Sequence, residues 1–554
     1  MKIKKIFIQG YRSIKEPLEL NLEQINAIIG SNNSGKSNIL SAIYRVLGRD
    51  WVTVNTFSDN DVHNEEYDTD IIIDFEFDEP LKYEKFKGIP VDIHKIRFEY
   101  TRYEIGESKG QRRLEKHCLR LDGNSVSVLK EKPKKGQSNQ YMPLTTIPLE
   151  LQESFPVIFI GADRNLKNQL PNSRYSILGT LMKDINIDFE NPENLIEIKP
   201  GSNKMIPRAE RFNQAIDEAI RALRTDEFIA LEKALKENAL IQLDFDPETE
   251  ADKLDLFFNP LTSLEFYKSL EIYIKENNYQ VNATELGAGF QNAIVLAILR
   301  AFEDRKKQGA LFLIEEPEMF LHPQMQRSLY KTIRQIGETN QVIYTTYSPH
   351  FITIPEFDEI TLVSKNENGT HVRKSTLKPD ENLKNKFRKE LDPERNELFF
   401  AKKVLIVEGD TEKMTFPEFA KRMNFDFDSI GSTIVEVGGK RNIESIVDLA
   451  LSFNIPVGFV YDTDSSDFGK DKKQEEAEYN KNLNSYVIMS VKVFEFDKNY
   501  EDECKKFYSE QTYQEYCQRF GGNKTHRARL MAQDDSIPIP EFVKPIITWL
   551  GEFK

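Results

Sequence analysis

The chain has 554 residues, 39% of them hydrophobic and 30% charged, which is typical of a globular protein of about three to four domains and excludes disorder throughout. The formal net charge of −15 argues against a coat on nucleic acid, because phosphate neutralisation drives such binding, although an acidic enzyme can still act on DNA. Three cysteines without Cys-x-x-Cys spacing, no visible secretory signal and no apolar run of about 18 residues predict a cytoplasmic protein with no disulfide framework, zinc ribbon or membrane contact.

The first predicted elements are strands over residues 3–9 and 25–29 and a helix over Lys36–Leu47. Before this helix, Gly30-Ser-Asn-Asn-Ser-Gly35-Lys36-Ser37 fits the Walker A pattern, and a chance glycine-rich turn is the weaker alternative. In this setting loop N–H groups cradle phosphates, Lys36 reaches the β- and γ-phosphates, and Ser37 ligates Mg²⁺. The residues assigned to ATP here are Gly30, Asn33, Gly35, Lys36, Ser37 and Asn38.

A helical pattern replaces the strands over residues 208–240, after strands predicted at Ile71–Phe77 and Ile96–Tyr100. Apolar residues line one face of a first helix and continue on a second: Phe212, Ile216, Ala219, Ile220 and Leu223, then Phe228, Leu231 and Leu235. We interpret this pair as an insertion in a largely α/β chain. Its apolar face either packs inside the chain, which the sequence favours, or forms a surface between two copies.

A glycine-containing loop follows, with the sequence Thr284-Glu-Leu-Gly287-Ala-Gly289-Phe-Gln. It resembles the signature loop of the ABC ATPase superfamily, which caps the γ-phosphate of ATP held by a second subunit. Gly287 replaces the usual serine, so the resemblance implies contacts from backbone N–H groups at Gly287 and Gly289. The alternative is an ordinary glycine-rich helix start.

An apolar strand over Leu311–Ile314 ends in Glu315 and Glu316. In a P-loop protein such a strand carries the acidic position that holds Mg²⁺, which we assign to Glu315. Glu316 would orient or deprotonate the attacking water. Without the Walker A motif, two acids at a strand end would more often be a solvated strand end.

A helix over Gln324–Ile336 and a strand over Gln341–Thr345 lead to Thr345-Thr346-Tyr347-Ser348-Pro349. This segment resembles the switch of the same superfamily, in which a histidine normally follows the two threonines. Tyr347 occupies that position, and His350 lies three residues later. Because tyrosine cannot readily replace an imidazole near neutral pH, we expect ATP binding with slow or absent turnover.

A second α/β unit is predicted to begin at Val404–Val407, after a charged linker helix over residues 377–400. Its first strand ends in Glu408-Gly409, and a later strand ends in Asp462-Thr-Asp464. Alternate residues at a strand end point the same way, and adjacent parallel strands would add Glu408 at the carboxyl edge. Three carboxylates repel one another unless a divalent ion neutralises them. The two motifs together resemble the TOPRIM domain, and two unrelated acidic strand ends are the alternative.

Other features narrow the chemistry of such a domain. A topoisomerase needs a further tyrosine-bearing cleavage domain, for which no room remains. A primase usually brings a zinc module, which three scattered cysteines cannot supply. Metal-assisted hydrolysis by water remains.

An ABC head followed by a TOPRIM domain resembles the OLD (overcoming lysogenization defect) family of nucleases along nearly the whole chain, including the Phe399–Lys403 lead-in. The resemblance implies an α/β fold in which an ABC-type P-loop ATPase head with a helical dimerisation insertion precedes a C-terminal TOPRIM α/β domain. The implied divisions are 1–165 and 246–395 for the two parts of the head, 166–245 for the insertion and 396–554 for the nuclease domain.

The resemblance also implies site residues and cofactors. Two Mg²⁺ or Mn²⁺ ions would serve the TOPRIM site, and ATP with Mg²⁺ would serve the head. The metal positions carried over are Glu408, Glu412, Asp462 and Asp464, with Glu501 for the second ion. Lys524 would stabilise transition-state charge, and an ordinary loop lysine is its alternative.

The sequence therefore predicts an ATP-regulated, divalent-metal-dependent DNA endonuclease acting in antiphage defence, the last point by resemblance alone. The implied partners are double-stranded DNA, further copies of the chain in a homodimer or tetramer, and a defence-system partner such as a helicase or a retron component. The rival hypothesis is an ATP-dependent DNA-binding clamp with a non-catalytic TOPRIM docking domain. The three clustered acids favour the enzyme.

Overall fold

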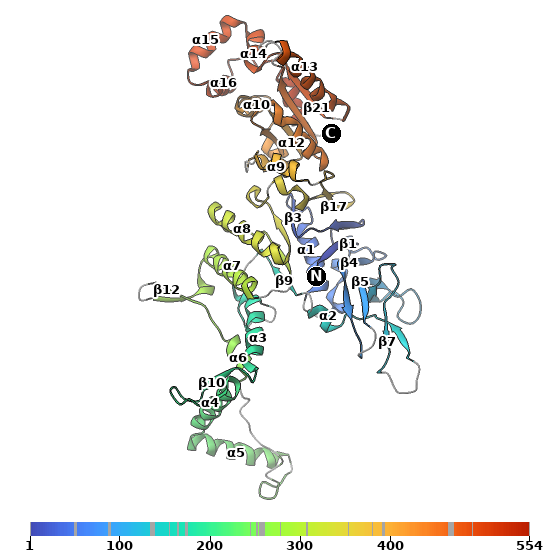
Figure 1. Cartoon of the computed structure of the whole chain (residues 1–554), viewed down its shortest axis with the longest axis vertical. Coiled ribbons are helices and arrows are strands. Elements are labelled where there is room, and N and C mark those ends of the chain that lie inside the picture. The colour runs from blue at the N-terminus through green and yellow to red at the C-terminus, as the bar shows by residue number, and fades with distance from the viewer. Residues whose placement is uncertain are drawn as a thin grey trace. The chain divides into compact units, whose positions relative to one another are not determined.

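The chain forms two compact units, one of residues 1–162 with 308–554 and the other of residues 163–307 (Figure 1). The computed structural model describes residues 2–48, 52–86, 90–132, 139–153, 156–162, 166–171, 176–243, 245–250, 253, 261–276, 279–305, 309–352, 354–378, 380–389, 394–463, 470–489 and 491–552. Within these ranges no helix combines the length and hydropathy needed to cross a bilayer.

The predicted ATPase head is built on a largely parallel sheet of strand order β17-β16-β3-β15-β14-β9. Its strands are β3 (Ile25–Gly30), β9 (Val157–Ile160), β14 (Leu311–Glu315), β15 (Gln341–Thr346), β16 (Ile360–Asn366) and β17 (Gly369–Lys374). Only the β16–β17 pair is antiparallel among these strands. The carboxyl ends of β3, β15 and β14 therefore meet at one edge, where the predicted phosphate-binding and acidic residues follow them.

Helices pack on this sheet as the sequence predicts. Helix α1 (Lys36–Leu47) packs on β3, β15, β14 and β9, and α8 (Pro323–Thr339) packs on β15. Every residue of β3 is buried, as expected for a strand covered on both faces.

An antiparallel sheet of order β2-β1-β4-β5-β6 shares a hydrophobic core with α1. Its strands are β1 (Ile3–Gln9), β2 (Leu18–Asn21), β4 (Ile71–Tyr83), β5 (Val91–Arg102) and β6 (Arg112–Leu119). A short pair follows, β7 (Ser127–Leu129) with β8 (Tyr141–Pro143), and then α2 (Leu149–Glu153).

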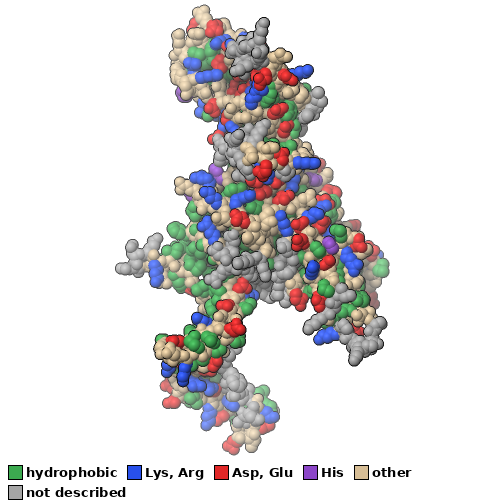
Figure 2. Space-filling view, viewed as in Figure 1, with side chains coloured by type: hydrophobic (Ala, Val, Ile, Leu, Met, Phe, Trp, Pro, Cys, Tyr) green, Lys and Arg blue, Asp and Glu red, His purple; other side chains and the backbone are tan. Residues whose placement is uncertain are grey.

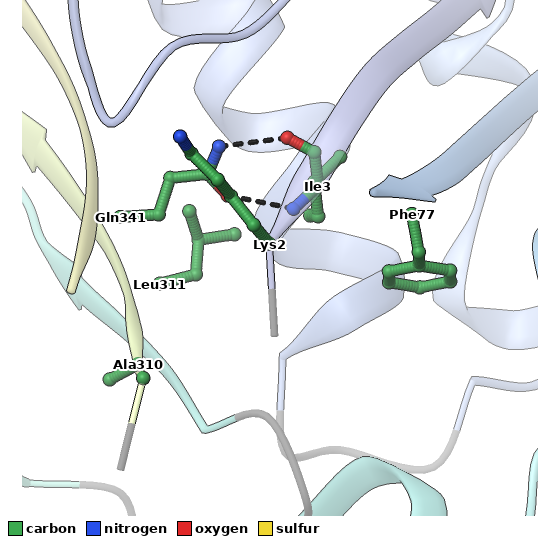
Figure 3. A pocket seen from close by; sticks show the side chains of 7 residues that line it. Lys2, Ile3, Phe77, Ala310, Leu311 and Gln341 are labelled. Carbon is green, nitrogen blue, oxygen red and sulfur yellow. Dashed lines mark hydrogen bonds between the residues drawn. The ribbon is translucent and has the colours of Figure 1, made fainter. Parts of the chain in front are cut away.

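The side chain of Gln341, at the start of β15, joins the two sheets (Figure 3). Its Oε1 accepts a hydrogen bond from the Ile3 N–H at 2.9 Å, and its Nε2 donates to the Ile3 carbonyl at 2.8 Å. The amide thus pairs with Ile3 as a neighbouring strand would. The cavity between Gln341, Ile3, Phe77 and Leu311 measures about 10 Å³, which is far too small for a ligand.

The C-terminal part of this unit contains a parallel sheet of order β19-β18-β20-β21 (orange to red in Figure 1). Its strands are β18 (Lys403–Val407), β19 (Ser432–Glu436), β20 (Val457–Asp462) and β21 (Lys492–Phe496). Its helices are α10 (Asp410–Arg422), α11 (Phe427–Ile430), α12 (Ile443–Ser452), α13 (Lys470–Ser485), α14 (Tyr500–Tyr508), α15 (Glu510–Phe520), α16 (Lys524–Gln533) and α17 (Lys544–Gly551). Residues of α10, α14, α16 and α17 pack with β18 in one core cluster.

The structure describes two helical segments within the predicted linker helix over 377–400. Helix α9 (Glu381–Lys389) forms the first part, and the short 3₁₀ helix η9 (Arg395–Phe399) leads into β18. Phe399 packs edge to face on Phe453, with ring centroids 5.3 Å apart.

The second unit consists mainly of helices. Its elements are α3 (Ile177–Glu190), β10 (Leu195–Glu197), β11 (Met205–Pro207), α4 (Arg208–Leu223), α5 (Asp226–Gln242), α6 (Ser263–Lys268), β12 (Tyr273–Glu276), β13 (Tyr279–Asn282) and α7 (Ala288–Arg305). The predicted helical pair corresponds to α4 and α5, and the Thr225 hydroxyl caps α5 by accepting from the Phe228 N–H.

The apolar face of this pair is only partly covered within the chain. Phe212 of α4 makes edge-to-face contacts with Phe189 and Phe266, so this part packs inside the unit. On α5, by contrast, Leu231 and Leu235 are 55% and 51% exposed. Hydrophobic side chains are accordingly visible on the surface of this unit in Figure 2. The part of the face around Phe212 therefore fits packing inside the chain. The part around Leu231 and Leu235 fits a surface between two copies.

Candidate functional sites

The loop after β3 has the backbone conformation that a phosphate-binding loop needs. Asn33 and Gly35 have positive φ angles of 63° and 107°, and a Cβ on Gly35 would lie 2.2 Å from the Thr370 hydroxyl. The buried Ser34 hydroxyl has no hydrogen-bond partner among the described residues. An orphaned polar atom beside a helix N-terminus fits an anionic ligand such as a nucleotide phosphate.

Lys36, the first residue of α1, points back over this loop. Its Nζ donates to the carbonyls of Gly30 and Ser31, both at 2.9 Å. Burial lowers the pKa of Lys36 to about 8, although the carboxylates of Glu316 and Glu318 partly oppose this shift. Burial disfavours the charged form of Lys36, and the negative charge of a bound phosphate would favour it.

Glu315 and Glu316 lie at the adjacent strand end, as the sequence predicts. Glu315 is opposite Thr345 in the β14–β15 register. Glu316 has a φ of 45°, and its N–H donates to both the carbonyl and the hydroxyl of Thr345 at 3.1 Å. Such an unfavourable backbone conformation in a residue other than glycine often marks a functional position.

Glu318 is a residue of this site to which the sequence reasoning assigned no role. Its Oε1 accepts from the Thr346 hydroxyl at 2.7 Å, the Tyr347 N–H at 2.6 Å and the Ser348 N–H at 3.2 Å. Its other oxygen is buried and has no partner among the described residues. Glu318 therefore fixes the backbone of the switch-like segment. The sequence feature that could have indicated Glu318 is its position as a third carboxylate, two residues after Glu316.

Tyr347 itself lies on Lys36. Its ring centroid is 3.7 Å from the Lys36 Nζ, within the range of a cation–π interaction. Burial raises the pKa of Tyr347, and the nearby carboxylates of Glu316, Glu315 and Glu318 add to this effect. The hydroxyl therefore stays protonated at neutral pH, in agreement with the expectation that it cannot act as an imidazole would.

The signature-like loop belongs to the second unit and precedes α7. The Gln291 side chain holds it by donating to the carbonyls of Thr284 at 3.1 Å and Leu286 at 2.8 Å. A Cβ on Gly287 would meet nothing within 4 Å, so packing within the chain does not require glycine there. Contact of Gly287 and Gly289 with ATP on another subunit stays a prediction.

In the C-terminal sheet, Glu408 and Asp462 lie side by side at the carboxyl edge. They follow or end the adjacent strands β18 and β20, and Glu408 Oε1 accepts from the Asp462 N–H at 2.6 Å. The Lys440 Nζ donates to the Asp462 carbonyl at 2.5 Å and pairs with Glu476 at 2.6 Å. The peptide groups on both sides of Asp462 are thus held by side chains. Asp464 lies outside the described residues.

Three predicted residues come to this edge from helices. Glu412 lies in the first turn of α10, Glu501 in the first turn of α14, and Lys524 begins α16. Lys524 Nζ lies 2.8 Å from Glu501 Oε2. Burial tends to lower the pKa of Lys524, but the bond to Glu501 and the carboxylates of Glu412 and Asp462 raise it above its ordinary value.

Glu412 is a buried carboxyl at this edge with a strongly raised pKa. Burial raises its pKa to about 7, and the nearby carboxylates of Asp462 and Glu501 contribute further. The buried Oε1 of Glu501 has no hydrogen-bond partner among the described residues. A buried acid beside two other carboxylates, one with an orphaned oxygen, fits a divalent cation.

The described carboxylates of this edge do not yet form a closed ligand set. Where the structure describes the chain, the group with three ligand atoms within 4.8 Å of one another lies elsewhere, at Glu99, Glu115 and His117 on β5 and β6. Arg97 and Arg113 lie 3.3 and 3.0 Å from the two glutamates there, so their charge is already balanced. We assign no metal to that group.

Comparisons with known proteins identify the two predicted domains. Residues 1–352 match the family described as AAA ATPase domain, and residues 399–464 match the overcoming lysogenization defect protein-like TOPRIM domain. The chain is 28% identical over 476 residues to the OLD nuclease of Thermus scotoductus, an alignment that covers 83% of this chain and 82% of that protein. It is 23% identical over 450 residues to Endonuclease GajA of Bacillus cereus VD045, covering 79% and 71%. A solved SMC head bound to the C-winged helix domain of ScpA aligns with a TM-score of 0.37 and 15% identity, covering 67% of this chain and 97% of that one.

Proposed function

Because the chain belongs to the OLD family, with an SMC/ABC-like ATPase head followed by a TOPRIM domain, we propose that it is an ATP-regulated, divalent-metal-dependent endonuclease of double-stranded DNA. The observation that carries the proposal is the gathering of acids at one sheet edge. Glu408 accepts a hydrogen bond from the Asp462 N–H there, the Glu501 carboxylate contributes to the raised pKa of the buried Glu412, and Lys524 forms an ion pair with Glu501. A docking surface has no need for a buried carboxyl with a pKa of about 7.

The residues of this edge have different proposed roles in hydrolysis of the phosphodiester: binding the metal ions, stabilising negative charge and positioning Asp462. Glu408, Asp462 and Asp464 would hold one Mg²⁺ or Mn²⁺ ion, and Glu412 and Glu501 would help to hold a second. When bound, the ions supply an activated water and stabilise the leaving oxygen of the phosphodiester. Lys524 would place its ammonium beside the negatively charged phosphate. Lys440 would keep Asp462 in position through the carbonyl that it binds.

The head would bind ATP with Mg²⁺ and control the nuclease rather than drive it. Lys36, Ser37, Glu315 and Glu316 are the residues proposed for the phosphates, the ion and the attacking water. Tyr347 supports slow or absent turnover, because its ring occupies the position where an imidazole is usual. Metal-dependent hydrolysis of DNA itself consumes no ATP.

Assembly and biological role extend the same proposal. The signature-like loop would complete an ATP site on a second copy, and the exposed face of α5 offers an apolar surface for pairing independent of ATP. We therefore propose a homodimer, or a tetramer made from two of them. A role in antiphage defence, with a helicase or retron component as partner, rests on family resemblance.

The direct test is cleavage of supercoiled plasmid with Mg²⁺ or Mn²⁺. Wild-type protein should linearise or nick the plasmid, and Asp462→Asn should lose this activity. Glu495→Gln is the matched control, because Glu495 is the penultimate residue of the neighbouring strand β21, lies opposite Tyr461 and accepts a hydrogen bond from the Tyr461 hydroxyl. Equal cleavage by Asp462→Asn would reject the site, whereas DNA binding without cleavage by wild type under every metal would favour the ATP-dependent clamp.

A further inference from the structure

The Tyr347 ring covers the Lys36 ammonium, which also donates hydrogen bonds to carbonyls of the P-loop. The ring centroid lies 3.7 Å from Nζ, while the carbonyls of Gly30 and Ser31 accept the ammonium's hydrogen bonds. Lys36 is only 3% exposed as a result. A buried cation on an aromatic face is held more firmly than an exposed one.

A nucleotide phosphate and this ring need the same ammonium. A phosphate oxygen makes a charge-assisted hydrogen bond with the ammonium, which a neutral ring cannot match, so bound nucleotide would displace the ring. The backbone of Tyr347 is tethered by Glu318, which also binds Thr346 and Ser348. Displacement of the ring therefore acts on the whole tethered segment.

This segment is attached directly to the start of the C-terminal domain. It continues into η7 (Pro349–Phe351), and the Asn396 Nδ2 donates to the carbonyls of Pro349 at 2.8 Å and Ile352 at 2.9 Å. Asn396 is 4% exposed and lies in η9, which leads into β18. A buried amide that bridges two loop carbonyls resists separation of the two segments.

Residues beside Asn396 extend the attachment to the acidic edge. The Arg395 Nε donates to the carbonyl of Glu436, the last residue of β19, at 2.9 Å. Glu394 pairs with Lys413, the neighbour of Glu412 in α10. Short contacts thus connect the lysine of the predicted ATP site with a helix that carries a predicted metal ligand.

We propose that Tyr347 is the nucleotide sensor of this chain: its ring competes with a nucleotide phosphate for Lys36, and displacement of the ring is transmitted through Asn396 to the TOPRIM edge. The proposal rests on the ATP-regulated function proposed above and names the device that performs the regulation. Coupling of this kind is reciprocal, so metal at the TOPRIM edge must alter nucleotide affinity by the same factor.

Equilibrium titration with a fluorescent ATP analogue tests the first half. Tyr347→Ala removes the competing ring and should bind the analogue roughly thirtyfold more tightly, the factor that corresponds to a desolvated cation–π contact. Tyr347→Phe keeps the ring and should bind as wild type does. Equal or weaker binding by Tyr347→Ala would overturn the proposal, as would wild-type affinity unchanged by saturating Mn²⁺.

Hydrogen exchange of residues 394–413, with and without ATP, tests the second half. Nucleotide should change exchange there in wild type, and Asn396→Ala or Arg395→Met should abolish the change while still binding the analogue. Two variants guard against one that fails to fold. An unaltered response in both would overturn transmission through η9. Neither measurement needs DNA cleavage. A protein that does not cleave plasmid would therefore reject the proposed nuclease activity, while the titration and the exchange experiment would still decide whether Tyr347 is a nucleotide sensor.

Discussion

The buried carboxyl of Glu412 makes the metal-free domain sensitive to pH. Burial, with help from Asp462 and Glu501, raises its pKa from the ordinary 4.5 to about 7. A raised folded-state pKa means that the folded protein binds this proton more tightly than the unfolded chain does. The stability contributed by the proton is complete below pH 4.5 and is lost as pH rises through about 7. The full difference corresponds to about 3 kcal/mol of unfolding free energy.

Glu412→Gln removes the titration and keeps the shape of the side chain. At pH 8 without metal, the variant should be more stable than wild type by up to about 3 kcal/mol, and at pH 5 the two should be nearly equal. Glu418→Gln is the matched control on the same helix. Arg529 Nη2 lies 3.0 Å from Glu418, so this substitution should destabilise the protein at pH 8 instead.

Urea unfolding in the presence of a chelator measures these differences. Trp549 in α17 packs near Phe494 and reports on this domain, provided that Trp51→Phe removes the other tryptophan. Mn²⁺ at pH 8 should then stabilise wild type more than Glu412→Gln, because the variant keeps the three acids proposed for the first ion and loses a proposed ligand of the second. If the variant is no more stable than wild type at pH 8, or if Mn²⁺ stabilises both equally, the reasoning about Glu412 is wrong.

The remaining predictions concern metal positioning, nucleotide binding and assembly. Lys440→Met should weaken Mn²⁺ binding by about tenfold, whereas Arg441→Met, which removes ion pairs with Glu475 and Glu476 and a contact with the Tyr479 ring, should not; equal losses in a Mn²⁺ titration would contradict positioning through the β20 carbonyl. Lys36→Ala should weaken binding of the ATP analogue at least about tenfold and leave metal-dependent cleavage measurable, so complete loss of cleavage would count against separate sites. Leu231→Asp with Leu235→Asp should shift the light-scattering mass toward the 64.4 kDa of one chain, and an unchanged oligomer would place the interface elsewhere.

Much of the fold was predictable because its signals are local in the sequence. The strand–loop–helix at Gly30–Lys36 and the strands before Glu315 and Glu408 all occur where apolar periodicity and motif agree. The α/β class, with an ATPase head followed by a TOPRIM domain, is confirmed by the family matches. The predicted roles of individual site residues remain predictions.

The missed residues act through contacts that no local pattern encodes. Glu318, Lys440 and Asn396 each bind backbone groups of another segment of the chain, and residue type and position in the sequence do not predict such a partner. The contact of Tyr347 with Lys36 joins the residue after β15 to the first residue of α1, and the pairing of β15 with β3 brings these two segments together. Exposure of Leu231 could not be predicted either, because helical periodicity identifies an apolar face but not what covers it.

The Gln341 amide has a mechanical consequence for strand β15. Gln341 fixes the first residue of this strand to Ile3, while Glu318 fixes the residues that follow its last one. A strand anchored at both ends and paired with β3 and β14 along its length cannot translate along its own axis without breaking several hydrogen bonds at once. Any displacement that begins at Tyr347 must therefore proceed toward Pro349. In the other direction strand β15 is held by the bond between Gln341 and Ile3, which are 338 positions apart in the sequence.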